Sequence, residues 1–149
     1  MVTRLNPYLN FRQSAEEAIT FYQSLFGGEV AISRFSDYGM EVPPEEGNLV
    51  MHSQLDTPSG FTLMVSDTPS YMELSESGNV SVSLSSGPEG EEELTGYWHK
   101  LLEGGTQTVP LEKAPWGDSF GMLTDRFGIK WLVNIAGSGA ADSETAEQA

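Results

Sequence analysis

The feature of this sequence that most constrains its fold is a signal that occurs twice. A helical pattern that ends on a glycine pair and runs into a strand-like segment appears in FYQSLFGGEV and again in WHKLLEGGTQTV. The two glycine pairs, Gly27-Gly28 and Gly104-Gly105, lie 77 residues apart. Self-similarity at a fixed spacing indicates that a structural unit is duplicated.

Each half of the chain predicts the same order of elements, namely a strand, a helix and three further strands. In the first helix, SAEEAITFYQSLF, Ser14 and Glu17 have the spacing of a capping box, and the second helix begins near Pro88. Apolar residues recur at helical spacing in both segments, so Tyr22 and Trp98 are expected in the core. The strands are expected at residues 5–11, 29–35, 49–56 and 61–66, and at residues 79–85, 106–111, 120–124 and 130–135.

These elements predict an α+β fold of tandem βαβββ modules. A four-stranded module with a helix on one face cannot bury its other face alone. Pairing the two modules would produce a curved, eight-stranded, mostly antiparallel half-barrel sheet around a cleft, with the helices outside. The predicted boundaries are 1–66 for the first module, 67–78 for a linker, 79–136 for the second module and 137–149 for a disordered acidic tail.

Composition narrows the class of protein. The chain has 149 residues and no cysteine, which excludes disulfides and thiolate metal sites. No secretion signal opens the sequence and no apolar run approaches the roughly 20 residues of a membrane span, so a cytoplasmic protein is expected. The net charge of -15 would repel phosphate backbones and anionic lipid, so neither nucleic acid nor membrane is an expected partner.

The sequence resembles the vicinal oxygen chelate superfamily, which contains glyoxalases, bleomycin-resistance proteins and extradiol dioxygenases. The match is closest to its PhnB-like branch, and it is carried by NPYLNF, SAEEAITFYQSLFGGEV, VMHSQL, FTLMVSD and WGDSFGMLTDRFGIKWLVNI. The resemblance implies two βαβββ modules, a cytoplasmic location and a homodimer. Relatives are often labelled as a demethylubiquinone methyltransferase, although no glycine-rich loop after a strand suggests an S-adenosylmethionine site here.

The same resemblance allows the metal positions to be compared. Metal-dependent members hold their ion with four residues, mostly His and Glu, on the first and last strands of each module. Those positions fall on Asn6 or Pro7, Met64, Asn79 and Leu132. A divalent ion needs three or four converging nitrogen or oxygen donors, which these side chains do not supply. The sequence therefore predicts no bound metal and no cofactor.

His52 is the candidate catalytic residue. It lies in the middle of the strand VMHSQL, where a histidine facing the cleft could act as a general base or as a hydrogen-bond donor near neutral pH. The alternative is a histidine that is simply satisfied by a cross-strand partner. The other histidine, His99, lies among charged residues of a helix and is expected on the surface.

Other residues are candidates for ligand binding. Trp116 and Phe120, in APWGDSFGM, could stack a planar ligand, or they could close the core or a dimer contact. Amides on or next to the strand positions that line the cavity in relatives would bind polar ligand atoms without a metal. The predicted ligand-binding residues are Asn6, His52, Met64, Asn79, Trp116, Phe120 and Asn134.

Three classes of function follow. The preferred one is a metal-independent protein that binds a small organic molecule, as bleomycin-resistance relatives do, and the acidic surface suits a cationic ligand. The alternative is a lyase, isomerase or dioxygenase of the superfamily that acts on a small oxygenated substrate, with a divalent metal or with His52 as acid/base. A purely structural role has no positive support in the sequence.

Overall fold

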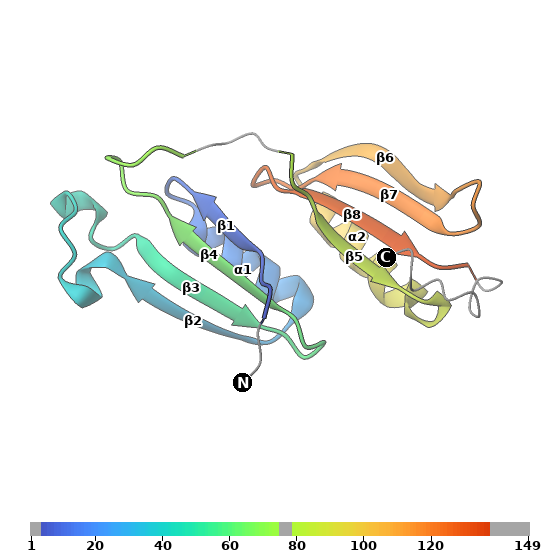
Figure 1. Ribbon diagram of the computed structural model, residues 1–149, viewed down its shortest axis with the longest axis horizontal. Coiled ribbons are helices and arrows are strands. Elements are labelled where there is room, and N and C mark those ends of the chain that lie inside the picture. The colour runs from blue at the N-terminus through green and yellow to red at the C-terminus, as the bar shows by residue number, and fades with distance from the viewer. Residues whose placement is uncertain (1–3, 75–78, 138–149) are drawn as a thin grey trace. The chain divides into compact units, whose positions relative to one another are not determined.

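The computed structural model describes residues 4–74 and 79–137 of the chain. It divides the chain into two compact units, Met1–Ser77 and Gly78–Ala149. Each unit contains one α-helix and four strands (Figure 1). Residues 75–78 of the predicted linker and 138–149 of the predicted acidic tail lie outside the described residues. Asp67, which was expected to open the linker, is the last residue of a strand.

The order of elements is the same in both units. The first contains β1 (Tyr8–Phe11), α1 (Ala15–Phe26), β2 (Glu29–Arg34), the 3-10 helices η1 (Phe35–Tyr38) and η2 (Pro44–Glu46), β3 (Val50–Asp56) and β4 (Thr62–Asp67). The second contains β5 (Val82–Ser86), the 3-10 helix η3 (Pro88–Gly90), α2 (Glu91–Leu102), β6 (Thr106–Lys113), β7 (Ser119–Thr124) and β8 (Lys130–Ile135). Neither α1 nor α2 is long and apolar enough to cross a membrane.

Each unit has a mixed four-stranded sheet with the equivalent strand order. The order is β1-β4-β3-β2 in the first unit and β5-β8-β7-β6 in the second. The pairs β1–β4 and β5–β8 are parallel, and the other pairs are antiparallel. The α+β class and the duplicated βαβββ order are thereby confirmed. The joining of both sheets into one eight-stranded half-barrel stays a prediction.

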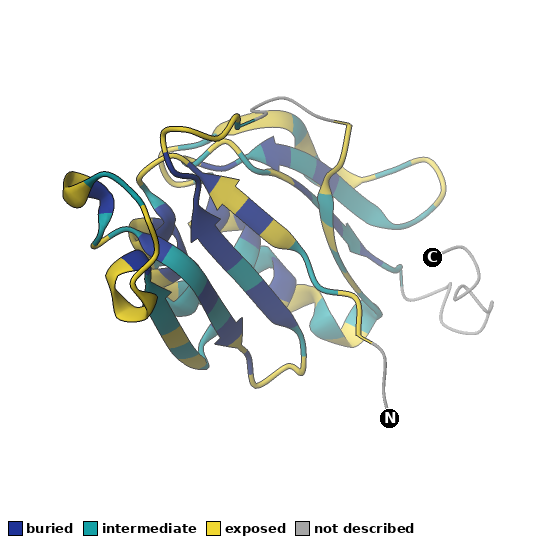
Figure 2. Ribbon diagram, turned by 60° about the vertical axis from the view of Figure 1, so that its left-hand side comes forward, coloured by how far each residue is buried: buried dark blue, intermediate teal, exposed yellow. Residues whose placement is uncertain are grey.

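One face of each sheet packs against the helix of its own unit (Figure 1). Tyr22 on α1 and Trp98 on α2 are buried, as their spacing predicted. Strand residues alternate between this buried side and the opposite side, which produces the banded burial in Figure 2. The opposite side of each sheet is called the helix-free face below. The buried strand residues of the helix-facing sides include Leu55, Leu63 and Val65 in the first unit and Leu123, Trp131 and Val133 in the second.

The glycine pairs are required by the same backbone contact in both units. The first glycine of each pair follows the helix with a φ of 77° or 76°, in the left-handed region that favours glycine. A β-carbon on Gly28 would overlap the carbonyl oxygen of Asp56 at the end of β3. A β-carbon on Gly105 would likewise overlap the carbonyl oxygen of Thr124 at the end of β7. The repeated sequence signal is therefore a repeated close approach of backbones.

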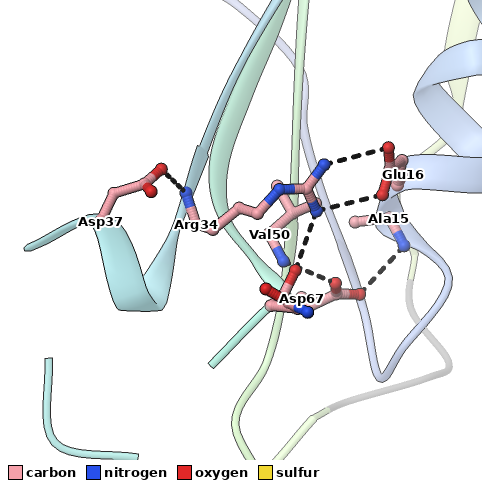
Figure 3. Close-up of polar contacts among 7 residues, drawn as sticks. Ala15, Glu16, Arg34, Asp37, Val50 and Asp67 are labelled. Atoms are coloured by element: carbon pink, nitrogen blue, oxygen red, sulfur yellow. Dashed lines mark hydrogen bonds and ion pairs between the residues drawn. The ribbon is translucent and has the colours of Figure 1, made fainter. Parts of the chain in front are cut away.

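The start of α1 is held by a residue of β4 and not by the predicted capping box. Ser14 is the N-cap, but its side chain makes no capping hydrogen bond. Instead, Asp67 Oδ1 accepts a hydrogen bond from the Ala15 N–H, and its Oδ2 accepts one from the Val50 N–H, both at 2.9 Å (Figure 3). Burial raises the pKa of the Asp67 carboxyl, against the opposing effect of these two hydrogen bonds. A single buried carboxyl group thus ties together β4, α1 and β3.

Candidate functional site

In the second unit, the WGD segment forms the turn between β6 and β7. The Gly117 N–H donates to the Ala114 carbonyl at 2.9 Å, and Gly117 has a φ of 102°. The carboxylate of Asp118 reaches the end of β8, where Oδ1 accepts from the Gly137 N–H and Oδ2 accepts from Asn134 Nδ2, each at 3.1 Å. The turn therefore fixes the side chain of Asn134.

This turn brings together three of the predicted ligand-binding residues. Phe120 on β7 lies opposite Asn134 on β8 in the sheet register. The rings of Trp116 and Phe120 meet edge to face, with centroids 5.8 Å apart and planes at 63°. Trp116 keeps 61% of its surface exposed. Together with Asp118, these three residues are called the aromatic–amide cluster.

The cluster offers aromatic surface and hydrogen-bond acceptors. Asn134 donates its amide nitrogen Nδ2 to Asp118. Within the described ranges, no protein group donates a hydrogen bond to its oxygen Oδ1. Glu112, an exposed residue of β6, lies opposite Phe120 in the register and adds a second carboxylate nearby. Such a set suits a planar ligand that carries N–H donors or a positive charge.

In the first unit, His52 lies on the helix-free face of the sheet. Its Nδ1 is 2.8 Å from the hydroxyl oxygen of Tyr8 on β1, and the two ring centroids are 5.5 Å apart. The cross-strand partner that was the alternative for His52 is therefore present, and a catalytic role for His52 stays a prediction. Tyr8 was not predicted, because it lies at none of the metal positions of the relatives. The signal was available, since strand alternation places Tyr8 on the side opposite the apolar residues Leu9 and Phe11, which are buried.

Met64 lies between Tyr8 and Gln54 in the register, on the helix-free face of the first unit. Asn6 precedes β1, so the expected strand start at residue 5 was wrong. The preceding residue of β1 is Pro7, which has no N–H to donate to a sheet. Asn6 is half-buried and belongs to the first unit.

Asn79 is also outside the sheet, so the expected strand start at residue 79 was wrong. β5 pairs in parallel with β8, and Val82 lies opposite Trp131. Asn79 lies three residues before Val82, and β8 begins only one residue before Trp131, at Lys130. No residue of β8 therefore lies opposite Asn79. Asn79 is exposed there. Asn134 lies farther along the sheet, opposite Ser85 of β5.

The residues at the four metal positions of the relatives do not fit a divalent ion. They comprise the amides of Asn6 and Asn79, the thioether of Met64 and the hydrocarbon side chain of Leu132. Within residues 4–74 and 79–137, no group of three or more His, Cys, Asp or Glu side chains is arranged to hold a metal. Divalent metal sites in proteins are built mainly from carboxylate, imidazole and thiolate ligands, which these positions lack.

A surface hollow of about 740 Å³ lies elsewhere in the first unit, lined by Arg12, Ser70, Tyr71, Met72, Glu73 and Leu74. The Nη1 atom of Arg12 donates to the carbonyl oxygens of Thr68, Pro69 and Met72 at 2.8–3.2 Å. Arg12 thus fastens the segment after β4 to the start of α1. None of the predicted ligand-binding residues lines this hollow.

Most of the string WG…FGMLTD…FGI.W is explained by structure. Gly121 leaves space for the ring of Trp98. Asp125 accepts hydrogen bonds from two N–H groups of the turn that follows it and, at 2.9 Å, from Nε1 of Trp131. Trp116, Asp118 and Phe120 are the residues of the string that belong to the aromatic–amide cluster. The presence of this string in the sequence therefore predicts the fold more directly than it predicts the ligand.

Comparisons with known proteins agree with this fold. Residues 3–134 match the family model described as 3-demethylubiquinone-9 3-methyltransferase. Protein YjdN of Escherichia coli (strain K12) is 26% identical over an alignment of 145 residues, and the match covers 88% of this chain and 94% of that protein. The crystal structure of PA1353 from Pseudomonas aeruginosa is 33% identical with a TM-score of 0.80, covering 92% of this chain and 100% of that chain.

A Bacillus cereus structure described as a putative 3-demethylubiquinone-9 3-methyltransferase, PhnB protein, is 29% identical with a TM-score of 0.71, covering 90% of this chain and 100% of that chain. Structures of glyoxalase/bleomycin resistance protein/dioxygenase members at lower identity share the fold alone. The chain therefore has the vicinal oxygen chelate fold and belongs to the PhnB-like family whose model is described as 3-demethylubiquinone-9 3-methyltransferase.

Proposed function

We propose that the chain binds a small, planar organic cation at the aromatic–amide cluster of the second unit, without a bound metal. The observation that carries this proposal is the position of Trp116. Its indole ring is 61% exposed, although Phe120 supports one edge and Asp118 anchors the turn beside it. Tryptophan is usually among the more buried residues, so an exposed ring on an ordered turn suits a ligand that covers it.

Electrostatics supports a cation as the ligand. The chain carries 22 acidic and 7 basic residues, so its field attracts cations and raises their local concentration. Asp118 and Glu112 place carboxylates beside the aromatic pair. Tryptophan is the best aromatic partner for a cation, and such contacts contribute about 0.5–2 kcal/mol. A planar cation with an N–H group could also donate to Asn134 Oδ1.

The residues do not support methyl transfer from a nucleotide-type donor. Such donors are held by a glycine-rich loop that follows a strand of a parallel sheet. Here each sheet is mixed, with a single parallel pair. The link from β1 to α1 contains no glycine. In the link from β5 to α2, the Ser86 side chain occupies the position where a β-carbon on Gly90 would lie, so a ligand cannot approach the backbone there. No step of a reaction is therefore assigned to such a donor.

The proposal is tested by calorimetric titration with N-methylquinolinium and with its neutral counterpart quinoline at neutral pH and low salt. We expect the cation to bind more tightly than the neutral ring. Trp116→Ala should weaken binding of the cation at least fivefold, because about 1 kcal/mol or more of ring contact is lost. Tyr71→Ala is the matched control, since Tyr71 is an aromatic residue of the first unit with 63% exposure.

Equal affinity of the wild type and Trp116→Ala for N-methylquinolinium would show that the ligand does not bind at the aromatic–amide cluster. Equal binding of quinoline and its methylated cation would remove the charge preference. Elemental analysis of protein purified without a chelator checks the metal-free state. A stoichiometric metal that raises the melting temperature would show that the positions compared above were misassigned.

We further propose that the chain forms a homodimer. In each described sheet the outer strands, β1 and β2 or β5 and β6, pair on one side only. Unpaired strand edges favour association with another strand unless they are covered. Light scattering at micromolar concentration should give twice the mass of the chain, and a monomeric mass would contradict this.

A further inference from the structure

The first unit contains a polar pair that the proposed cation site does not use. Tyr8 and His52 lie on the helix-free face and meet across β4, with 2.8 Å between the hydroxyl oxygen and Nδ1. Tyr8 is 45% exposed and His52 is half-buried. In the described part of the chain, no protein group hydrogen-bonds the other ring nitrogen of His52, Nε2. One nitrogen is thus held by the protein, and the other is left for a ligand.

The contact with Tyr8 suits every protonation state of His52. A phenol can donate to an unprotonated Nδ1, and its oxygen can accept from a protonated one. If Nδ1 carries the proton, Nε2 is a free base. When Nε2 takes up a second proton, the Nδ1–H group can still donate to Tyr8. The pair can therefore exchange a proton at Nε2 without losing the hydrogen bond that orients the ring.

Within the described part of the first unit, the strand residues next to the pair are uncharged. β2 contributes Ser33, which lies opposite His52, and β4 contributes Met64, which lies opposite Tyr8. Farther along β1, Asn10 accepts a hydrogen bond from Ser66. The charged side chains on the strands around the pair are engaged elsewhere. Arg34 pairs with Glu16 of α1, and Asp67 of β4 is buried and accepts from the Ala15 N–H of α1. Glu29 and Asp56 lie opposite each other at the far ends of β2 and β3.

An uncharged face disfavours a single ion but tolerates a matched ion pair, because opposite charges in contact offset part of each other's desolvation cost. The net charge of -15 adds a repulsion against ligands that arrive as anions. A neutral acid meets neither obstacle. The exposed ring of Tyr8 and the thioether of Met64 offer apolar contact to a planar molecule.

We propose that the Tyr8–His52 pair is a second site, which takes a neutral, planar organic weak acid and accepts its proton. The O–H or N–H bond of the ligand breaks, the Nε2–H bond of His52 forms, and the ligand anion stays hydrogen-bonded to the imidazolium. No other reactant is needed, and the net charge of the complex does not change.

The probe is p-nitrophenol, whose neutral form is colourless and whose anion is yellow. At a pH just below the pKa of the free probe, adding the wild-type protein should increase the yellow absorbance in a saturable way. His52→Gln should abolish this increase, because glutamine has a similar size but cannot accept a proton. Tyr8→Phe should weaken binding about fivefold, the loss expected for one hydrogen bond of about 1 kcal/mol.

The chain provides its own control, because it has two histidines and the second, His99, is exposed on α2. His99→Gln should leave the colour change intact. A colour change that survives His52→Gln, or no colour change with the wild type, would overturn the proposal. Loss of the colour in Trp116→Ala but not in His52→Gln would also overturn it and move the acid to the aromatic–amide cluster. None of these outcomes alters the cation titration, so the two sites are tested separately.

Discussion

Replacing Gly121 with alanine should destabilise the second unit, and the structure gives the reason. Gly121 lies on β7 beneath α2. An added β-carbon would lie 2.7 Å from Cη2 and 2.9 Å from Cζ3 of Trp98, and 2.8 Å from the Cα of Leu111. The Leu111 atom belongs to the backbone of β6, so a change of rotamer cannot relieve the contact. Overpacking of a well-packed core typically costs about 1–3 kcal/mol, and we expect Gly121→Ala to lower the free energy of unfolding by this amount.

Gly96 provides a matched control in the same unit. It lies in α2, is exposed, and a β-carbon there would meet no atom within 4 Å. Alanine is more stable than glycine in a helix interior by roughly 0.5–1 kcal/mol. The same substitution should therefore raise the free energy of unfolding at Gly96 and lower it at Gly121.

Urea unfolding followed by tryptophan fluorescence measures both effects. The chain has three tryptophans, Trp98, Trp116 and Trp131, and all belong to the second unit, so the signal follows that unit. With an m-value of about 1–3 kcal/mol/M, a loss of 1–3 kcal/mol moves the midpoint by on the order of 1 M urea. A midpoint for Gly121→Ala at or above that of the wild type would refute the packing that the structure shows.

Three further predictions concern polar contacts. Burial, with a smaller contribution from Glu16, raises the pKa of Asp67, so the folded state binds its proton at a pH where the unfolded chain is ionised. The stability that Asp67 contributes therefore falls as pH rises from about 3.9, the pKa in the unfolded chain, through the higher pKa in the folded state. The free energy of unfolding of the wild type, relative to that of Asp67→Asn, should fall over this pH range, and a rise would contradict the reasoning. Trp131→Phe removes the donor to Asp125 Oδ2 and should cost about 1–3 kcal/mol by circular dichroism, whereas the exposed Trp116→Phe should stay within about 0.5 kcal/mol. Arg34 lowers the pKa of Glu16 by a hydrogen bond, but the pair is exposed, so Glu16→Gln should cost less than about 1 kcal/mol above pH 5, and a larger loss in thermal melts would contradict the assignment.

The sequence predicted the architecture well because the relevant signals are local and occur twice. Helical spacing identified Tyr22 and Trp98 as core residues, and each glycine pair marked the same backbone contact. The beginnings of β1 and β5 were predicted too early, because alternation within a strand shows which side a residue faces but not where its partner strand begins. The capping box also failed, since the Ser14 side chain makes no capping bond and Asp67, distant in sequence, binds the first N–H of the helix, that of Ala15.

The candidate site was predictable where its members share one motif or one pair of neighbouring strands. Trp116 and Phe120 are close in sequence, and Asn134 lies opposite Phe120 once β7 and β8 pair. The partner of His52 could not be identified in the same way. Tyr8 reaches His52 across an intervening strand, and that strand order follows from the parallel return of the chain and not from any local pattern.

The two units differ most in the connection between their second and third strands. In the first unit residues 35–49 form this connection and include η1 and η2, whereas in the second it is the short turn of residues 114–118. Both connections lie at the opposite end of the strands from the glycine contact, so either can change length without disturbing it. Lengthening a surface loop costs little entropy, about 0.6 kcal/mol for each doubling. After duplication, the two halves can therefore diverge at this connection without loss of the fold. The short connection of residues 114–118 holds the ring of Trp116 in place, whereas the long connection of residues 35–49 can accept insertions.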